Sequence, residues 1–382
     1  MVYKRVNLGI TLTSTAFLLS LLVMEFDEIP NVFIETSTSA LTISLVSATF
    51  GIMILSQLYK ETGVIETLSQ SLSETVRNSK LVVSLLPAIV GLLPVAGGAL
   101  MSAPLIEAEA DKLQFRRGMK TYVNIWFRHT IFPVYPMSQL LILAAALTGL
   151  SLTGLIVRQI PVVLSMVAVG YLIAFRKTSM SEDEVERGSF GANLKSLLLT
   201  FSPILAMICA VAIFDIDVAL AAFVGVAVLL LLARPGLVIL SKPFRNKALY
   251  GVALAAFGAM LLRNVTIASG ISDILGNIMA NVNVNEVVLL LAVPAVLSFL
   301  VGSPSGGIAI SVPMLAGTLN FIPQTAGLLF TAAYLGYIGA PTHLCLVLTA
   351  DYFKCPLGRL YKYLIPSLAI SFVAAIFVYF LV

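Results

Sequence analysis

The sequence predicts an all-α polytopic membrane protein with about nine full spans and two re-entrant hairpins, arranged as two inverted-topology repeats. Of its 382 residues, 59% are hydrophobic and only 11% are charged, whereas soluble domains carry about 25% charged residues. Apolar stretches long enough to cross a bilayer recur along the chain, as at 140–175. Two distant segments also resemble each other. These observations exclude a soluble enzyme, a nucleic-acid-binding protein and a disordered scaffold.

The positions of Lys and Arg predict the topology, because these residues concentrate in cytoplasmic loops. With the N-terminus in the cytoplasm and the C-terminus outside the cell membrane, about 20 of the 23 Lys and Arg fall on the cytoplasmic side. The net charge of +4 therefore reports topology rather than nucleic-acid binding. The exceptions are Arg128, Arg158 and Arg263. Full spans are expected near 8–24, 38–58, 119–149, 152–175, 197–214, 218–233, 248–269, 324–350 and 363–381.

Two apolar segments, 81–115 and 286–319, do not fit as simple spans. The first is broken by Pro-Val-Ala-Gly-Gly at 94–98, and the second by Gly-Ser-Pro-Ser-Gly-Gly at 302–307. Each arm is only about 15–20 Å long, short of the roughly 30 Å hydrocarbon core. Irregular backbone occurs at membrane depth only where it lines a cavity or is buried in protein. Both segments are therefore predicted to be re-entrant hairpins, with their bases on opposite sides.

An internal repeat relates the two halves of the chain. Residues 50–68 and 257–275 are identical at 6 of 19 positions, and the tips GGALMSAPL at 97–105 and GGIAISVPM at 306–314 also match. The charge pattern gives the two copies opposite orientations. Inverted repeats with interrupted helices are typical of secondary transporters. Residues 1–177 are thus expected to form the first repeat, 178–196 a cytoplasmic linker, and 197–382 an extra span followed by the second repeat.

Each predicted hairpin is followed by a span that contains a proline break. The span at 119–149 is interrupted by Pro133-Val-Tyr-Pro136, and the span at 324–350 by Gly-Ala-Pro-Thr-His at 339–343. Proline lacks a backbone donor and disrupts the preceding helical turn. The opened helix ends expose N–H groups that suit an anion and carbonyl groups that suit a cation. We expect the two tips and the two breaks to meet near the midplane.

The hairpin and broken helix in each half resemble the ion transporter (IT) superfamily, which includes gluconate and lactate permeases and the divalent anion:sodium symporters. Arg128-His129 followed by Pro133-Val-Tyr-Pro136, together with the tip at 97–104, is similar to an archaeal and bacterial integral membrane protein family within it. The resemblance implies a homodimer with a scaffold and a moving transport domain, which works as an elevator on small organic anions. The tips lack the Ser-Asn-Thr signature of the divalent anion symporters, so dicarboxylate specificity and sodium coupling are not implied.

Arg128 is the most informative candidate for substrate binding. It lies about nine residues into its expected span, roughly 13 Å deep. A charge at that depth costs at least about 2.5–3.5 kcal/mol on insertion scales, so the side chain is expected to face protein or water. A guanidinium there can bind a substrate carboxylate, in a bidentate manner if the geometry allows. The alternative is a structural pair with a carboxylate or a helix C-terminus.

The other candidates flank the same breaks and tips. His129 and His343 each flank one break, where a histidine can hydrogen-bond to substrate or carry a coupling proton, or is simply satisfied by backbone carbonyls. Serine and threonine hydroxyls can bind substrate or sodium, or pack helices, and tight tips require glycine. The full set of further substrate-binding candidates is Tyr135, Gly97, Gly98, Ser102, Ser305, Gly306, Gly307, Ser311 and Thr342.

The sequence predicts no cofactor, apart from Na⁺ or H⁺ as a coupling ion. Cys209, Cys345 and Cys355 show no metal-binding spacing and are interpreted as small apolar fillers. With only two histidines in the chain, a His-ligated metal centre is not expected. The expected partners are a small-molecule anionic substrate, the lipid bilayer and, by resemblance, a second copy of the chain.

The acidic residues favour an anionic substrate. All 19 Asp and Glu fall in expected loops or close to span ends, whereas a cation/proton antiporter requires a buried carboxylate relay. The sequence therefore favours a secondary active transporter (permease) of a small organic anion, most simply a carboxylate. A cation/proton antiporter, a membrane-embedded enzyme and a passive channel are the alternatives. An enzyme is disfavoured because the chain contains no H-E-x-x-H motif, nucleophile elbow or P-loop.

Overall fold

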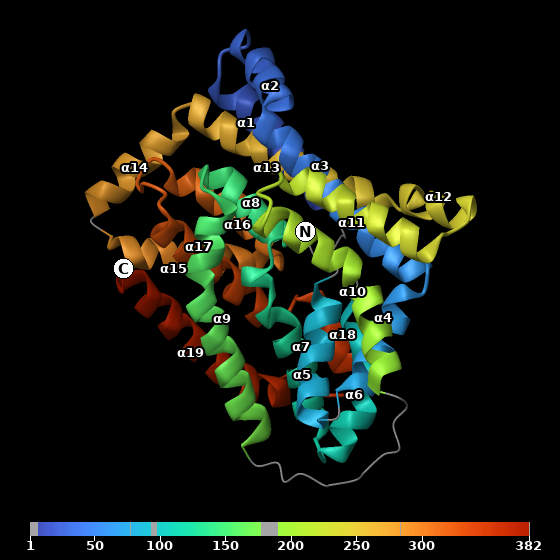
Figure 1. Cartoon of the computed structure of the whole chain (residues 1–382). Coiled ribbons are helices and arrows are strands. Elements are labelled where there is room, and N and C mark those ends of the chain that lie inside the picture. The colour runs from blue at the N-terminus through green and yellow to red at the C-terminus, as the bar shows by residue number, and fades with distance from the viewer. Residues whose placement is uncertain (1–6, 77, 93–97, 177–189, 283, 382) are drawn as a thin grey trace.

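The computed structural model describes residues 7–76, 78–92, 98–176, 190–282 and 284–381 (Figure 1). Within these ranges the chain is all-helical, with no strand. Seven of its segments, five continuous helices and two interrupted ones, are long and apolar enough to cross a membrane, judged by length and composition. The predicted class, a multi-pass helical membrane protein, is confirmed at this level. Leu8–Val23 and Val218–Ala233, which were expected to be full spans, have 16 residues each, fewer than the roughly 20 that a simple crossing needs.

The described residues of the first half form nine α-helices and one 3₁₀ helix. They are α1 (Leu8–Val23), α2 (Glu28–Thr38), α3 (Ala40–Glu61), α4 (Val64–Thr75), α5 (Ser79–Gly91), α6 (Gly98–Lys112), α7 (Arg117–Thr130), η2 (Phe132–Val134), α8 (Gln139–Thr148) and α9 (Leu152–Phe175).

In the second half, the part of the chain that the structure describes forms ten α-helices. They are α10 (Phe190–Ala212), α11 (Val218–Ala233), α12 (Leu237–Arg245), α13 (Lys247–Ala268), α14 (Ile271–Val282), α15 (Glu286–Val301), α16 (Pro304–Leu315), α17 (Pro323–Gly339), α18 (Leu344–Tyr352) and α19 (Leu357–Phe380). Helix α10 begins inside the range expected to be a linker, whose residues 178–189 lie outside the described parts of the chain.

The two segments expected to be hairpins are pairs of short, packed helices. Helix α5 packs on α6, and α15 packs on α16. The first arm of each pair begins with an asparagine cap, since Asn78 Oδ1 accepts from the N–H of Lys80 and Asn285 Oδ1 from that of Val287, both at 2.9 Å. Such caps satisfy the free N–H groups of a first turn. The arms of 13 and 16 residues are about 20 and 24 Å long.

The two proline-containing spans are interrupted helices. Helix α7 ends at Thr130, and the chain passes through the short η2 helix before α8 begins at Gln139. Helix α17 ends at Gly339, and α18 begins at Leu344. The prolines contribute to both interruptions because they cannot donate to the helical ladder, although Pro161 of α9 and Pro366 of α19 lie inside continuous helices. Both interruptions therefore lie at the sequence positions that suggested them.

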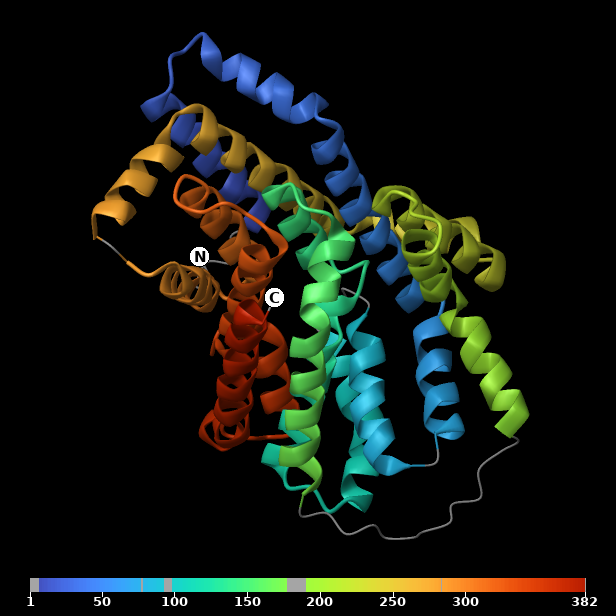
Figure 2. The same cartoon turned by 60° about the vertical axis from the view of Figure 1, so that its left-hand side comes forward.

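Packing joins the two halves across the molecule (Figures 1 and 2). Helix α5 packs on α7 and α15 on α17, while α6 contacts α18 and α16 contacts α8. Helix α9 lies along α19. Helices α10 and α11 pack beside α3 and α4, and α1 packs along α13 at another edge. Each hairpin thus contacts the broken helix of its own half and the second segment of the broken helix of the other half, α18 for the first hairpin and α8 for the second.

Candidate functional site

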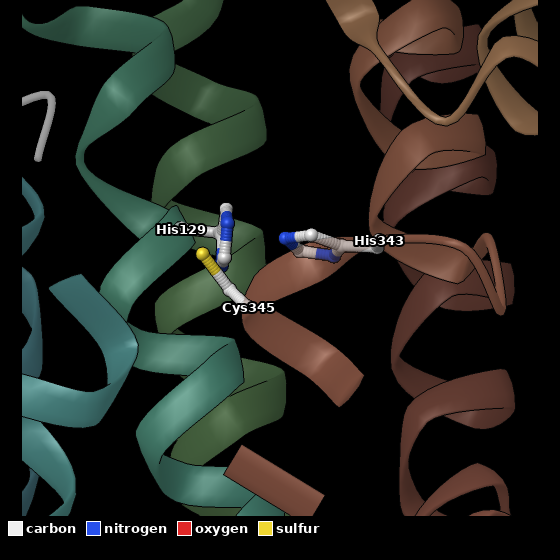
Figure 3. Close-up of side chains that lie close together, drawn as sticks. All are labelled: His129, His343 and Cys345. Carbon is white, nitrogen blue, oxygen red and sulfur yellow. The ribbon is translucent and has the colours of Figure 1, made fainter. Parts of the chain in front are cut away.

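The two helix interruptions, marked by His129 and His343 at 214 positions from each other in sequence, face each other in the structure. His129, near the end of α7, and His343, just before α18, have ring centroids 4.8 Å apart with ring planes at 82°. Figure 3 shows the ring of His343 and the sulfur of Cys345 both directed toward His129. One potential ligand atom from each of these three residues lies within 4.8 Å of the others. We call this cluster of His129, His343 and Cys345 the crossing.

His129 is fixed at the crossing by two hydrogen bonds. Its side chain is 3% exposed, and Nδ1 lies 2.6 Å from the carbonyl oxygen of Ile125, one turn earlier in α7. A carbonyl only accepts, so Nδ1 carries the proton and Nε2 of the neutral ring keeps its lone pair. The backbone carbonyl of His129 accepts a hydrogen bond of 2.7 Å from the Tyr334 hydroxyl on α17. The second half therefore holds the end of α7 in place.

His343 is fully buried and its ring nitrogens are unsatisfied. Neither Nδ1 nor Nε2 has a hydrogen-bond partner among the described residues. The carbonyl of Ile338 is the backbone group that acts on the imidazole, but no hydrogen bond that meets both distance and angle limits joins the two. The ring of Tyr337 packs against the imidazole with centroids 4.0 Å apart. Buried polar groups in folded proteins are normally paired, so the two ring nitrogens of His343 lack the partners that a buried imidazole normally has.

Arg128 is buried against the first hairpin. Its side chain is 3% exposed, and Nη1 is buried with no hydrogen-bond partner in the described parts of the chain. A Cβ added to Gly91, at the end of α5, would overlap the Arg128 carbonyl oxygen and lie 3.3 Å from its Cγ. The guanidinium interacts electrostatically with His129, His343 and Tyr334. Its charge is therefore directed at the crossing.

The tip of the second hairpin touches the second interruption. Gly302 has a φ of +68°, and a Cβ at that position would lie 2.6 Å from Thr342 Oγ1. Gly307 is buried against α15, where an added Cβ would overlap Ser298 Oγ and lie 2.9 Å from Ser298 N. Glycine is therefore required at both positions, by backbone conformation at Gly302 and by close approach at Gly307.

The remaining candidates of the second half lie around this tip. Ser311 is buried and donates to the Gly307 carbonyl at 2.6 Å. Gly306 is buried, Ser305 is half-buried, and Thr342 is exposed. The Ser311 hydroxyl is therefore used in a hydrogen bond within its own helix, while the side chains of Ser305 and Thr342 have accessible surface.

In the first hairpin, the described contacts involve Ser102 and a residue that sequence reasoning missed. Ser102 is fully buried and donates to the Ala99 carbonyl at 3.3 Å. Asn124 of α7 donates to the same carbonyl at 3.0 Å and to Thr349 Oγ1 of α18 at 3.1 Å. Its Oδ1 is buried without a hydrogen-bond partner in the described ranges. Asn124 precedes Arg128 by four positions and so shares its helix face, a signal that the sequence contained.

Gly98 begins α6, and Gly97 lies outside the described residues. Tyr135 contributes less to the crossing than the two histidines. Tyr135 is 3% exposed, and its electrostatic contact is with Tyr59 of α3. The residues that the sequence did not identify, Cys345 and Tyr337, stand within six positions of His343 on either side of the second interruption.

The fold and the crossing define a multi-pass helical membrane protein in which two interrupted helices meet beside a buried arginine. A family profile described as "Protein of unknown function (DUF401)" matches residues 1–382, and the chain belongs to this family. No curated protein matches the sequence. The fold is similar to that of the Alcanivorax borkumensis YdaH transporter, whose crystal structure is described as revealing an unusual topology. The TM-score is 0.56 at 13% identity, over 97% of this chain and 96% of that chain. This likeness concerns the fold.

Proposed function

We propose that this protein is a secondary active transporter of a small organic anion that carries a carboxylate, coupled to Na⁺ or H⁺. The observation that carries the proposal is the buried Arg128 guanidinium at the crossing, with Nη1 unpaired among the described residues. A charged donor without a counter-ion is costly in a buried site. A substrate carboxylate would supply the missing charge and hydrogen bonds.

The arrangement of helices supports alternating access between two inverted repeats. The order α3, α4, α5–α6, α7–α8, α9 recurs as α13, α14, α15–α16, α17–α18, α19. The contacts recur as well, because α5 on α7 matches α15 on α17 and α6 on α18 matches α16 on α8. Interrupted helices at matching positions of two repeats mark transporter binding sites. The similarity to the YdaH transporter fold agrees with this class.

In this proposal the hairpins and broken helices form the moving transport domain, and the helices around α3, α10 and α11 belong to the scaffold. The protein would work by an elevator movement as a homodimer in the cell membrane, with the N-terminus cytoplasmic and the C-terminus outside. Arg128 would bind the carboxylate, while Asn124 Oδ1 and the hydroxyls of Ser305 and Thr342 are available to polar groups of the substrate or to a coupling ion. No enzymatic activity is proposed.

A thermal-shift screen of the purified full-length protein tests this proposal. The screen covers mono- and dicarboxylates, including gluconate and lactate, and amino acids, each with and without sodium at pH 6 and pH 8. A ligand at 100 times its Kd stabilises the folded state by about 2.7 kcal/mol. We expect a carboxylate to raise the Tm of the parent protein but not that of Arg128→Gln.

The matched control is Arg158→Gln, which removes the same charge from α9 at a half-buried site beside the Val378 carbonyl. This variant should keep the ligand-induced shift. If Arg128→Gln folds and responds to the carboxylate as the parent does, Arg128 does not bind substrate. Shifts with sodium or pH alone would favour the cation/proton antiporter instead. Accumulation of the ligand against its gradient in proteoliposomes distinguishes a transporter from a passive channel.

A further inference from the structure

We infer that the crossing holds a site for a soft monovalent metal ion, Cu⁺, with His129, His343 and Cys345 as its ligands. The inference is independent of the transport proposal. It departs from the sequence-based expectation, which considered only spacing along the chain. The structure brings one imidazole from the first half of the chain to an imidazole and a thiol from the second half, with the potential ligand atoms all within 4.8 Å of one another.

The hydrogen-bonding state of the two histidines suits metal binding. His129 Nδ1 donates to the Ile125 carbonyl, and metal-ligating histidines almost always donate their other N–H to a carbonyl, carboxylate or water. This bond fixes Nε2 as the nitrogen with the free lone pair. The His343 ring is fully buried, and both of its nitrogens are without partners among the described residues. An imidazole in that state has a lone pair available and loses no protein hydrogen bond when it binds a metal.

The separations are close to those of a coordinated site. Nitrogen and sulfur ligands bind transition metals at about 2.0–2.3 Å, so the ligand atoms of a trigonal site lie roughly 3.5–3.8 Å apart. The three ligand atoms, now within 4.8 Å of one another, must each move by about 1 Å to reach these separations, which side-chain rotation can provide. His343 and Cys345 lie at the start of α18, next to the interruption, where the backbone is not held by the ladder of a continuous helix.

The charge at the crossing favours a monovalent ion. Thiolate ligands select soft metals such as Cu⁺. When Cu⁺ binds, the Cys345 thiol releases its proton to solvent and a sulfur–copper bond forms, so the net charge of the site is unchanged. Zn²⁺ binding with the same proton release would add one positive charge, close to the buried Arg128 guanidinium. An uncompensated buried charge is costly, and Zn²⁺ should therefore bind more weakly than Cu⁺ or its redox-stable analogue Ag⁺.

Silver binding to the full-length, detergent-purified protein tests the inference. The parent for this experiment carries Cys209→Ser and Cys355→Ser, which leave Cys345 as the only thiol. We expect one Ag⁺ per chain to remain after desalting against a weak competing ligand, as measured by elemental analysis. Cys345→Ser should lose this ion, and His343→Asn should weaken its binding at least tenfold. Silver binding to the methionines would be the same in every variant and is subtracted as the amount retained by a variant in which all three ligands are replaced, His129→Asn, His343→Asn and Cys345→Ser together.

Four results would overturn parts or all of the inference. If Cys345→Ser keeps one Ag⁺ at parental affinity, the thiol is not a ligand. If His129→Asn and His343→Asn both bind like the parent, silver is held by the thiol alone and there is no built site. Should either histidine variant fail to fold, X-ray absorption of the loaded parent decides, because a sulfur-only coordination shell contradicts the two imidazole ligands. Zn²⁺ affinity equal to that for Ag⁺ would refute the assignment to a monovalent ion.

Discussion

A close backbone approach between the second hairpin and its broken helix predicts opposite effects for two glycine substitutions. Gly336 lies inside α17, and a Cβ there would overlap the Ala295 carbonyl oxygen of α15 and lie 2.7 Å from its Cα. Backbone atoms cannot rotate away, so α15 would have to move by about 1 Å to restore ordinary van der Waals contact. Overpacking of this kind costs about 1–3 kcal/mol, and for backbone overlap we take the upper value. Alanine regains up to about 1 kcal/mol of helix propensity. The net loss for Gly336→Ala is therefore about 2 kcal/mol.

Gly358→Ala is the matched control. Gly358 lies at the start of α19, and an added Cβ meets no atom within 4 Å, so only the favourable propensity term remains. At about 2 °C per kcal/mol for a chain of this size, Gly336→Ala should lower the Tm by about 4 °C, while Gly358→Ala should leave it unchanged or raise it by up to about 2 °C. Thermal unfolding in one detergent at one scan rate measures both. A Gly336→Ala protein as stable as Gly358→Ala would refute the close approach of α15 and α17.

Two further predictions concern hydrogen bonds between the halves, both measured by thermal unfolding. Tyr334→Phe removes the hydrogen bond to the His129 carbonyl and should lower the free energy of unfolding by about 0.6–1.7 kcal/mol, the range for interhelical bonds in membrane proteins. The control Tyr361→Phe, which loses a hydrogen bond at a half-buried site, should lower it by less. Equal losses of stability in the two variants would contradict the reasoning. Gln159, 1% exposed, bonds to Thr331 Oγ1 at 2.7 Å and to a carbonyl of α17 at 2.9 Å. Gln159→Leu should cost about 1–3 kcal/mol, because these buried groups lose a partner, and an unchanged Tm would refute this assignment.

The positions of the helix interruptions could be predicted because proline and glycine act locally. Pro133 and Pro136 remove two helical donors within one turn, and α7 and α8 are separated there, whereas a single proline such as Pro161 of α9 or Pro366 of α19 lies inside a continuous helix. The long helices follow equally from apolar length. The sequence predicts less well where the ends of short helices lie, because packing decides whether a segment such as Val218–Ala233, 16 residues long, continues or turns.

The members of the crossing could be predicted only in part. Arg128 was conspicuous because a charge inside an apolar span is expensive. Asn124 and Cys345 were not, since neutral polar residues and cysteines are common in apolar helices as packing contacts. Their meaning depends on contacts between segments far apart in the chain, such as the bond from Asn124 to Thr349 across 225 positions. Spacing along the sequence cannot report such a contact, and for this reason the Cys345 thiol was interpreted as a filler.

The unsatisfied atoms at and beside the crossing share a physical consequence. Arg128 Nη1, Asn124 Oδ1 and both ring nitrogens of His343 are buried without hydrogen-bond partners in the described parts of the chain. Each such atom costs about 1–3 kcal/mol relative to a paired one, and all four belong to elements of the two broken helices. A stable fold tolerates this concentration of cost most readily if a ligand relieves it in the working state. An anion at Arg128 and a metal ion at the histidines would each remove a different part of that cost, so the two ligands can be distinguished by which variants abolish their binding.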